Sequence, residues 1–383
     1  MAEFGPEEAE VVTAQGFTRV DQLRARHWLA FVGPGVVVAR ADGSDLRSVF
    51  AHQRHRGGSD LLAWSPDGRT LYHPYDQVYA IDVATGEARA ITALPPGESI
   101  HALWFFWCSP GNRTLLFLQS LPEPGNSFTH RICTLGADGS STTAFEPFDS
   151  GLPWLLDVNW QRDLIVAEVP VRWGADIWRM DVTGRNRVRV ATLPHRIHDL
   201  ALSPDGTRLA MVLETGIWLF DLARQEWTGV AGAGTNLAWS PDGKAMAFMN
   251  DESELWLVRL EGEKPEFTAL AWVAGRKYSF RERGGSYAVK PVWSPDGRLL
   301  WFAIARRRRV RPDPRLVRRI EKRDFSHVPE AQRAQARASS LRHLEWKSTL
   351  FTGMVDFAER QVCLTESYRY RVAWSPRLEA PVE

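Results

Sequence analysis

The chain has 383 residues, of which 44% are hydrophobic and 24% are charged, a balance typical of soluble globular proteins. Its formal net charge is +1, so the overall charge predicts neither a nucleic-acid-binding protein nor a membrane-surface protein. The three cysteines, Cys108, Cys133 and Cys363, are too few and too irregularly spaced for a disulfide framework, and no CxxC pair exists to hold zinc.

Residues 1–27 are predicted to be an N-terminal extension, and they lack the basic and apolar regions of a secretory signal. No run of about 18 apolar residues occurs, so we expect no membrane span. These features predict a cytoplasmic protein. A periplasmic or secreted protein whose signal has been removed is the alternative.

Segment 28–50 predicts the second, third and fourth strands of a unit that lacks its first strand. A five-residue phrase then recurs along the chain, and such repeats decide the architecture. WSPDG occupies 64–68, 239–243 and 293–297, LSPDG occupies 202–206, CSPGN occupies 108–112, and a degenerate copy begins at Trp160. A truncated WSP at 374–376 ends the series.

Each phrase predicts a tight turn between two strands. Pro66 presets φ at the first central position of the turn, Asp67 suits the second, and Gly68 takes the left-handed conformation that follows. Ser65 or Asp67 can also hydrogen-bond nearby backbone N–H groups. Two further strands follow each hairpin, and four short strands per 37–54 residues is the pattern of a β-propeller blade.

The number of blades follows from these phrases. Six internal copies lie near Ser65, Ser109, Gln161, Ser203, Ser240 and Ser294. Segment 371–374 predicts a first strand without a blade, and pairing it with segment 28–50 makes a seventh blade and closes the ring. The sequence therefore predicts an all-β, seven-bladed β-propeller over residues 28–376, followed by a tail at 377–383. Six blades are the alternative if the region around residue 160 is not a blade.

The repeated WSPDG phrase resembles the WD-like repeat of TolB-type propellers, which is found also in the propeller domains of prolyl-oligopeptidase relatives. The resemblance covers about residues 28–376 and implies the fold. It does not select a function, because such propellers serve as scaffolds, lyases, peptidase gates and periplasmic adaptors. We expect neither the extra N-terminal domain of TolB nor a hydrolase domain. A lyase would need histidines with Gln or Arg in the channel, and no such cluster can be placed.

No catalytic motif is found. GxSxG, HExxH and GxxxxGK[ST] are absent, and the Gly of SPDG falls one position early for an Asp-box. The four repeated aspartates are interpreted as turn residues of separate blades: Asp67, Asp205, Asp242 and Asp296. The HxxH pairs His52/His55 and His195/His198 lack the further ligands of a metal site. We therefore predict no enzyme, and no catalytic, cofactor-binding or metal-binding residue.

An insertion at about residues 306–345 interrupts the last blade, between predicted strands at 299–305 and 347–357. It holds 13 Arg and Lys against five Asp and Glu, a net charge of +8, whereas the rest of the chain carries −7. Pro314 can open a first helix and Pro329 a second, Ala-rich one. The insertion is therefore predicted to be a basic helical arm. It either projects from the ring or folds back onto the acidic propeller.

The arm supplies the candidate partner-binding residues, since arginine suits bidentate contact with carboxylate or phosphate. They are Arg306, Arg307, Arg308, Arg309, Arg311, Arg315, Arg318, Arg319, Lys322 and Arg323. We predict a non-enzymatic scaffold that binds a protein partner within a larger assembly, with the arm on an anionic surface.

Two alternatives come from other functional classes. One is a propeller enzyme or carbohydrate-binding protein that uses the central channel. The predicted inner strands LLAW, IHDLAL, TNLAW and AVKPVW are mostly apolar or small, which argues against it. The other is a nucleic-acid-associated protein that acts through the arm. No membrane partner and no small-molecule substrate are predicted.

Overall fold

The computed structural model describes most of the chain, in segments separated by gaps. The described residues are 11–13, 17–19, 27–32, 35–51, 61–75, 77–92, 106–111, 113–123, 127–139, 142–145, 148, 153–232, 234–250, 254–262, 264–273, 290–309, 313–322, 334, 346–365 and 372–376.

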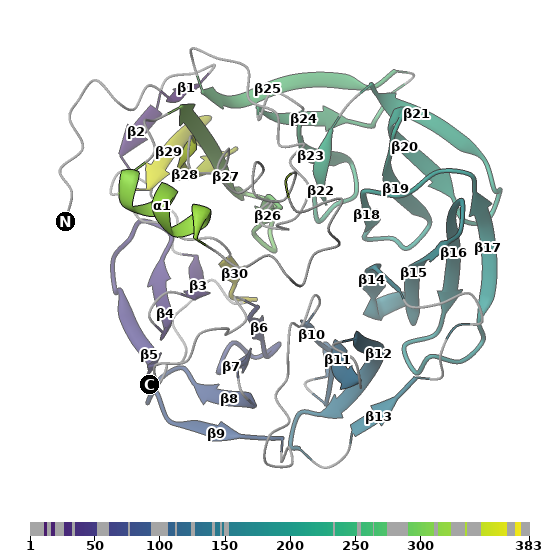
Figure 1. The fold of residues 1–383 in the computed structure, drawn as a ribbon, viewed down its shortest axis with the longest axis horizontal. Coiled ribbons are helices and arrows are strands. Elements are labelled where there is room, and N and C mark those ends of the chain that lie inside the picture. Colours follow the sequence, from purple (N-terminus) through teal and green to yellow (C-terminus); the bar gives the residue numbers. More distant parts are fainter. Residues whose placement is uncertain are drawn as a thin grey trace.

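Seven sheets follow one another around a central axis, which confirms the seven-bladed β-propeller (Figure 1). From the innermost strand outward, blade 1 has β30 (Val372–Trp374), β3 (Trp28–Val32), β4 (Gly35–Arg40) and β5 (Arg47–Ala51). Blade 2 has β6 (Ala63–Trp64), β7 (Thr70–Pro74), β8 (Val78–Asp82) and β9 (Ala88–Ala90). Blade 3 has β10 (Phe106–Cys108), β11 (Thr114–Glu123), β12 (Ser127–Gly136) and β13 (Thr142–Ala144).

The remaining blades continue in chain order. Blade 4 has β14 (Leu155–Asn159), β15 (Leu164–Val171), β16 (Gly174–Met180) and β17 (Val188–Leu193). Blade 5 has β18 (Asp199–Leu202), β19 (Arg208–Leu213), β20 (Gly216–Asp221) and β21 (Trp227–Ala231). Blade 6 has β22 (Thr235–Trp239), β23 (Ala245–Met249), β24 (Leu255–Arg259) and β25 (Glu266–Val273). Blade 7 has β26 (Val292–Trp293), β27 (Leu299–Arg309), β28 (Trp346–Asp356) and β29 (Gln361–Thr365).

The two ends of the propeller meet in blade 1, as the sequence predicts. Strand β30 pairs antiparallel with β3, with Leu29 opposite Trp374 and Phe31 opposite Val372. Alternation along β3 sends Leu29 and Phe31 into the apolar cluster with blade 7, and Trp28 and Ala30 into the cluster with blade 2. The β30–β3 pairing therefore completes blade 1, which packs against blade 7 on one side and blade 2 on the other.

The SPDG phrase forms the same turn in each complete copy. In the copy at 65–68, the Gly68 N–H donates to the Ser65 carbonyl at 2.9 Å, and the Ser65 hydroxyl donates to the Asp67 carboxylate at 2.6 Å. The Ser65 Oγ also accepts from the Thr70 N–H at 2.8 Å, and Gly68 has φ +68°. The copies at 203, 240 and 294 repeat this serine–aspartate hydrogen bond, so the aspartates are turn residues as interpreted.

The tryptophan before the phrase links neighbouring blades. The Trp64 indole N–H donates to the Ala373 carbonyl at 2.9 Å, and that of Trp239 to the Ala201 carbonyl at 3.0 Å. Trp293 donates to the Ala238 carbonyl at 3.1 Å. In each pair the acceptor lies on the inner strand of the preceding blade. The repeat therefore supplies both the turn within a blade and a hydrogen bond between blades.

The degenerate copy near residue 160 also turns the chain, so blade 4 is a true blade. A 3₁₀ turn, η2 (Trp160–Arg162), ends at Asp163, which has φ +49° in place of the glycine. Asn159 stands where other copies have tryptophan. Its Nδ2 donates to the Pro204 carbonyl of blade 5 at 2.7 Å. This copy is therefore also linked to a neighbouring blade, but to the following one, whereas the tryptophans bind the preceding one.

Two strands of the N-terminal extension lie on the outer edge of the ring. Strand β1 (Val11–Thr13) pairs antiparallel with β25 of blade 6, and β2 (Phe17–Arg19) pairs parallel with β29 of blade 7. Each adds a fifth strand to its sheet. The extension therefore covers the edges of two adjacent blades, a role that its sequence did not indicate.

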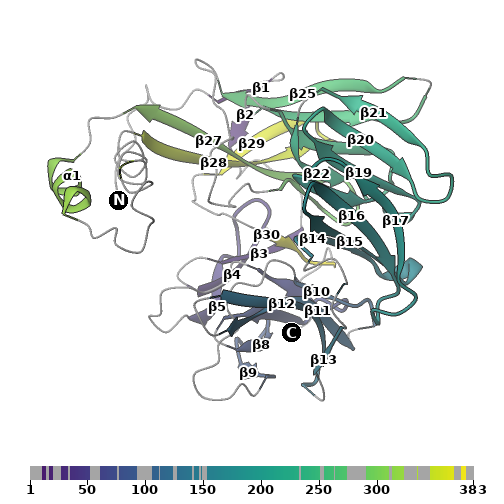
Figure 2. The same ribbon diagram turned by 45° about the vertical axis from the view of Figure 1, so that its right-hand side comes forward.

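The insertion of blade 7 leaves the ring as a β-hairpin before it becomes helical. Strand β27 continues through Arg309, which lies opposite Trp346 of β28, so Arg306–Arg309 belong to a strand. Helix α1 (Pro314–Glu321) follows, and Figure 2 shows it at the far end of the hairpin, away from the blades. The predicted second helix, beginning at Pro329, lies outside the described residues. No helix in the described part of the chain could cross a membrane by its length and apolarity.

Candidate functional site

Helix α1 is the basic tip of the arm. Pro314 occupies its first turn, and the Asp313 side chain caps it by accepting from the Arg315 N–H at 2.8 Å. Cationic side chains lie along its exposed surface: Arg315, Arg318, Arg319 and Lys322. Among the residues that the structure describes, none of the ion pairs involves these four side chains. The described part of the helix is therefore not held by charge pairing with the propeller.

The other predicted arm residues lie elsewhere. Arg306–Arg309 lie in the β27–β28 ladder, with Arg308 opposite Lys347 in the backbone register. Arg311 and Arg323 lie outside the described residues. The structure thus collects four of the ten predicted cations on one short helix and four on the strand that leads to it.

A second group of charged residues lies on the inner strands of blades 4 and 5. The Asp157 carboxylate accepts from the Leu202 N–H of the next blade at 2.8 Å. The Asp199 carboxylate accepts from the Leu237 N–H of blade 6 at 2.7 Å. A bulge in β22, where Asn236 has φ +60°, accompanies this last bond. Each aspartate therefore ties its blade to the next one.

Lys290, just before β26, extends this group across the ring. Its ammonium forms an ion pair with Asp199 and donates to the Leu200 carbonyl at 3.1 Å. Burial raises the pKa of Asp157, against the opposing effects of the Leu202 N–H and the Lys290 charge. Because the carboxylates already hold backbone groups and a cation, they link blades and are poorly placed as catalytic bases.

This inner-strand group was missed from the sequence. The predicted inner strands were described as mostly apolar or small, although IHDLAL contains Asp199 and AVKPVW contains Lys290. A charged residue at the corresponding place in successive first strands was the available signal. That signal is visible in the repeat, because Asp157, Asp199 and Lys290 each stand three residues before Trp160, Leu202 and Trp293, the first residues of their phrases.

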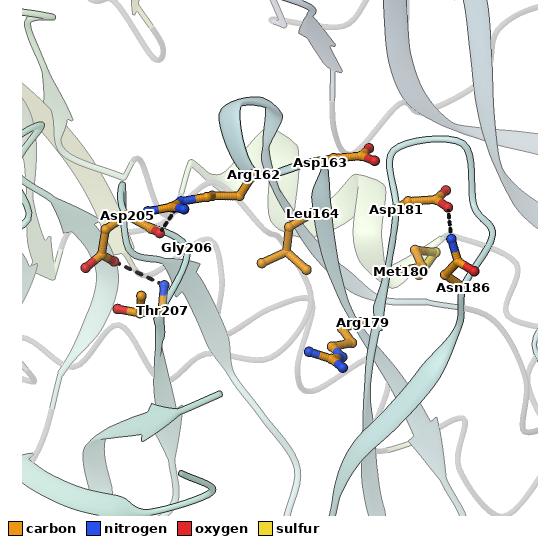
Figure 3. A pocket seen from close by; sticks show the side chains of 10 residues that line it. All are labelled: Arg162, Asp163, Leu164, Arg179, Met180, Asp181, Asn186, Asp205, Gly206 and Thr207. Carbon is orange, nitrogen blue, oxygen red and sulfur yellow. Dashed lines mark hydrogen bonds between the residues drawn. The ribbon is translucent and has the colours of Figure 1, made fainter. Parts of the chain in front are cut away.

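A cavity of about 500 Å³ lies between the turns of blades 4 and 5 (Figure 3). Its lining residues are Arg162, Asp163, Leu164, Arg179, Met180, Asp181, Asn186, Asp205, Gly206 and Thr207. The Arg162 Nε donates to the Asp205 carbonyl at 3.0 Å, and Asp181 accepts from Asn186 at 2.8 Å. Burial alone would raise the pKa of Asp205, but hydrogen bonds from Ser203 and Thr207 outweigh it and lower that pKa. Most polar groups that line the cavity therefore form hydrogen bonds that stabilise turns.

The remaining features noted in the sequence are the possible metal ligands and the cysteines. Within the described residues, no three His, Cys, Asp or Glu side chains gather in a way that could hold a metal ion. Burial raises the pKa of the Cys108 thiol to about 12. His52 and His55 lie outside the described residues.

Comparison with known proteins agrees with this architecture. No family model matches the chain. An uncharacterized peptidase of Bacillus subtilis, YuxL, is 28% identical over 124 residues, which are 28% of this chain and 17% of that protein. The matched part is thus well under two thirds of that relative.

Solved structures resemble the chain more widely. Oligogalacturonate lyase from Vibrio parahaemolyticus has a TM-score of 0.54 at 12% identity, covering 77% of this chain and 88% of that one. TolB from Acinetobacter baumannii has a TM-score of 0.45 at 14% identity, covering 64% and 65%. Together with the blades described above, the likeness to the lyase defines the protein as a seven-bladed β-propeller.

Proposed function

We propose that this protein is a non-enzymatic β-propeller scaffold whose basic arm binds an acidic surface on a partner protein. The observation that carries the proposal is helix α1, with four exposed cations held on a two-stranded hairpin away from the blades (Figure 2). The planar guanidinium of an exposed arginine can bind a carboxylate through two parallel hydrogen bonds, which the ammonium of a lysine does not.

The ring gives this arm a rigid base. Strands β27 and β28 pair without interruption from Leu299/Asp356 in the core to Arg309/Trp346 at the base of the helical part. Trp301, on the same strand, is 1% exposed and packs into the interface with blade 1. The arm is therefore anchored in the core of the propeller while its charges face solvent, an arrangement that suits docking.

The test is a pull-down from native lysate with and without nuclease. One variant carries Arg315→Ser, Arg318→Ser, Arg319→Ser and Lys322→Ser. A matched control carries four exposed blade arginines changed to Ser: Arg69, Arg89, Arg113 and Arg185. We expect a nuclease-resistant protein partner that the arm variant loses and the control keeps. Capture that nuclease abolishes would assign the arm to nucleic acid, and equal capture by both variants would contradict the proposal.

A further inference from the structure

Two tryptophans depart from the pattern of the other described ones. Trp173 is 77% exposed and Trp154 is 63% exposed, the highest values among the large hydrophobic residues described. In the blade interfaces, by contrast, Trp28 and Trp301 are 4% and 1% exposed. An indole that stays in water lacks the stabilising free energy of about 2–3 kcal/mol that burial would provide. Two such residues in one blade therefore call for an explanation.

Both tryptophans lie at the same end of blade 4. Trp154 directly precedes β14, and Trp173 lies in the turn from β15 to β16. Because Leu155 pairs with Glu168, the ladder places Trp154 beside Val169, four residues before Trp173. At about 3.3 Å per residue, the two backbone positions are about 13 Å apart.

Contacts within blade 4 hold both tryptophans in position. The Trp154 N–H donates to the Glu168 carbonyl at 3.0 Å, which continues the β14–β15 ladder. The Arg172 guanidinium lies 5.1 Å from the ring centre of Trp173, a cation–π contact that steadies one side of the indole. The two rings are therefore positioned by the blade and still open to solvent.

Polar residues lie at the same end of the propeller as the two rings. The loop that enters β18 from the same end of the propeller exposes His195, Arg196 and His198. Beneath Trp154, Glu168 is 3% exposed, and its Oε2 has no hydrogen-bond partner among the described residues. The surface thus combines flat aromatic rings with planar polar side chains.

We propose that Trp154 and Trp173 form a carbohydrate-binding surface that takes a neutral oligosaccharide. The axial C–H face of a sugar ring stacks on an indole, and its hydroxyl groups exchange hydrogen bonds with planar groups such as guanidinium, imidazole and carboxyl. Because the two backbone positions are about 13 Å apart, the pair suits a chain of several sugars better than a single one.

The surroundings disfavour a protein partner, and the test distinguishes a sugar from a nucleic acid. The other exposed aliphatic or phenyl side chains described are Leu46, Phe267 and Val188. Leu46 and Phe267 lie in other blades, and Val188 lies at the opposite end of blade 4. Among the described residues, no continuous apolar patch of the kind found in a protein hot spot lies around the pair. A nucleic acid could stack its bases on the same two rings, and the decathymidine probe described below separates that ligand from a sugar.

Calorimetry with three neutral probes, cellohexaose, maltohexaose and chitohexaose, tests the proposal on the whole protein. Trp154→Ala and Trp173→Ala are each expected to weaken binding of the recognised probe at least tenfold. Trp227→Ala is the matched control, because Trp227 is also exposed, at 37%, but lies on the outer strand of blade 5. Thermal melting confirms that each variant remains folded.

Three outcomes would overturn the proposal. The first is that none of the three probes binds at millimolar concentration. The second is that either blade 4 variant binds as well as the Trp227→Ala control. The third is that a decathymidine strand binds through the same two tryptophans more tightly than any sugar, which would assign the surface to base stacking.

Discussion

The two faces of the propeller differ in how regular their turns are. The turn face carries the SPDG turns at 65–68, 203–206, 240–243 and 294–297, and each repeats the same serine–aspartate hydrogen bond. The hairpin face carries the connections between second and third strands, which range from two residues in blades 1, 4 and 5 to 36 residues in blade 7. Blade 4 turns there in the two residues around Trp173, whereas blade 7 extends the arm.

The difference shows where this chain encodes its fold and where it can vary. A repeated local hydrogen-bond pattern specifies each blade on the turn face. Loops on the hairpin face can then change without loss of the ring, since they do not carry the contacts between blades. Both the basic helix and the exposed tryptophans lie on this variable face. The predictions below test that division, beginning with the ring itself.

Deleting residues 370–383 should have the largest effect. It removes β30, and with it the Ala373 carbonyl that accepts from Trp64 and the Ser375 N–H that donates to Trp28. We expect a loss of more than about 4 kcal/mol in the free energy of unfolding, because the ring opens at two interfaces. Deleting only 377–383 keeps β30 and is the control. Equal melting temperatures for the two truncations would refute the closure as a source of stability.

Burial raises the pKa of Glu168 to about 7 from an ordinary value of 4.5. The folded state therefore keeps a proton that the unfolded chain releases, and stability is lost as pH rises between these values. Replacing Glu168 with Gln should leave stability unchanged near pH 4 and raise it by about 3 kcal/mol at pH 8. Urea unfolding across this pH range measures the difference, and a variant that parallels the wild type at every pH would contradict the assignment.

Trp239→Phe keeps an aromatic ring between blades 5 and 6 but removes the indole N–H. The Ala201 carbonyl then loses its donor at a buried site. We expect a loss of about 2 kcal/mol, the cost of an unsatisfied buried acceptor with a small gap. Trp227→Phe, at an exposed position, should change stability by less than about 0.5 kcal/mol. A similar loss in both variants, measured by chemical unfolding, would show that the interblade bond is unimportant.

Ser240→Ala should cost less, about 1 kcal/mol, because it removes one hydroxyl from one turn. That hydroxyl donates to Asp242 at 2.5 Å, and its oxygen accepts from the Ala245 N–H at 2.9 Å. Ser44→Ala is the control, since the Ser44 hydroxyl also donates to an aspartate but at an exposed turn outside the repeat. If the two substitutions shift the unfolding midpoint equally, the SPDG turn contributes no more to stability than an exposed turn outside the repeat.

Much of the ring could be predicted from the sequence because its cause is local. Pro66, Asp67 and Gly68 each have a fixed preference in a turn, and the spacing of the copies sets the blades. The pairing of 371–374 with β3 was also predictable, since each end supplied the strand that the other lacked. Helix α1 began at Pro314 as expected.

What the sequence did not predict depends on distant contacts. Strands β1 and β2 are short and carry no turn phrase, so only their pairing with β25 and β29 identifies them. The link between Asp199 and Lys290 joins blades 5 and 7, which no local pattern encodes. Exposure is also a property of the fold, so Trp154 and Trp173 could not be separated in advance from the buried tryptophans.

The arm should have the smallest effect on the ring, and it carries the central functional proposal. The arm variant at Arg315, Arg318, Arg319 and Lys322 changes residues without ion pairs in the described part of the chain. The decisive experiment measures its melting temperature and its affinity for the captured partner on one preparation. We predict an unchanged melting temperature with a strongly weakened affinity, and a similar weakening of the wild type in high salt. A lowered melting temperature with intact affinity would instead show an arm folded back onto the acidic propeller.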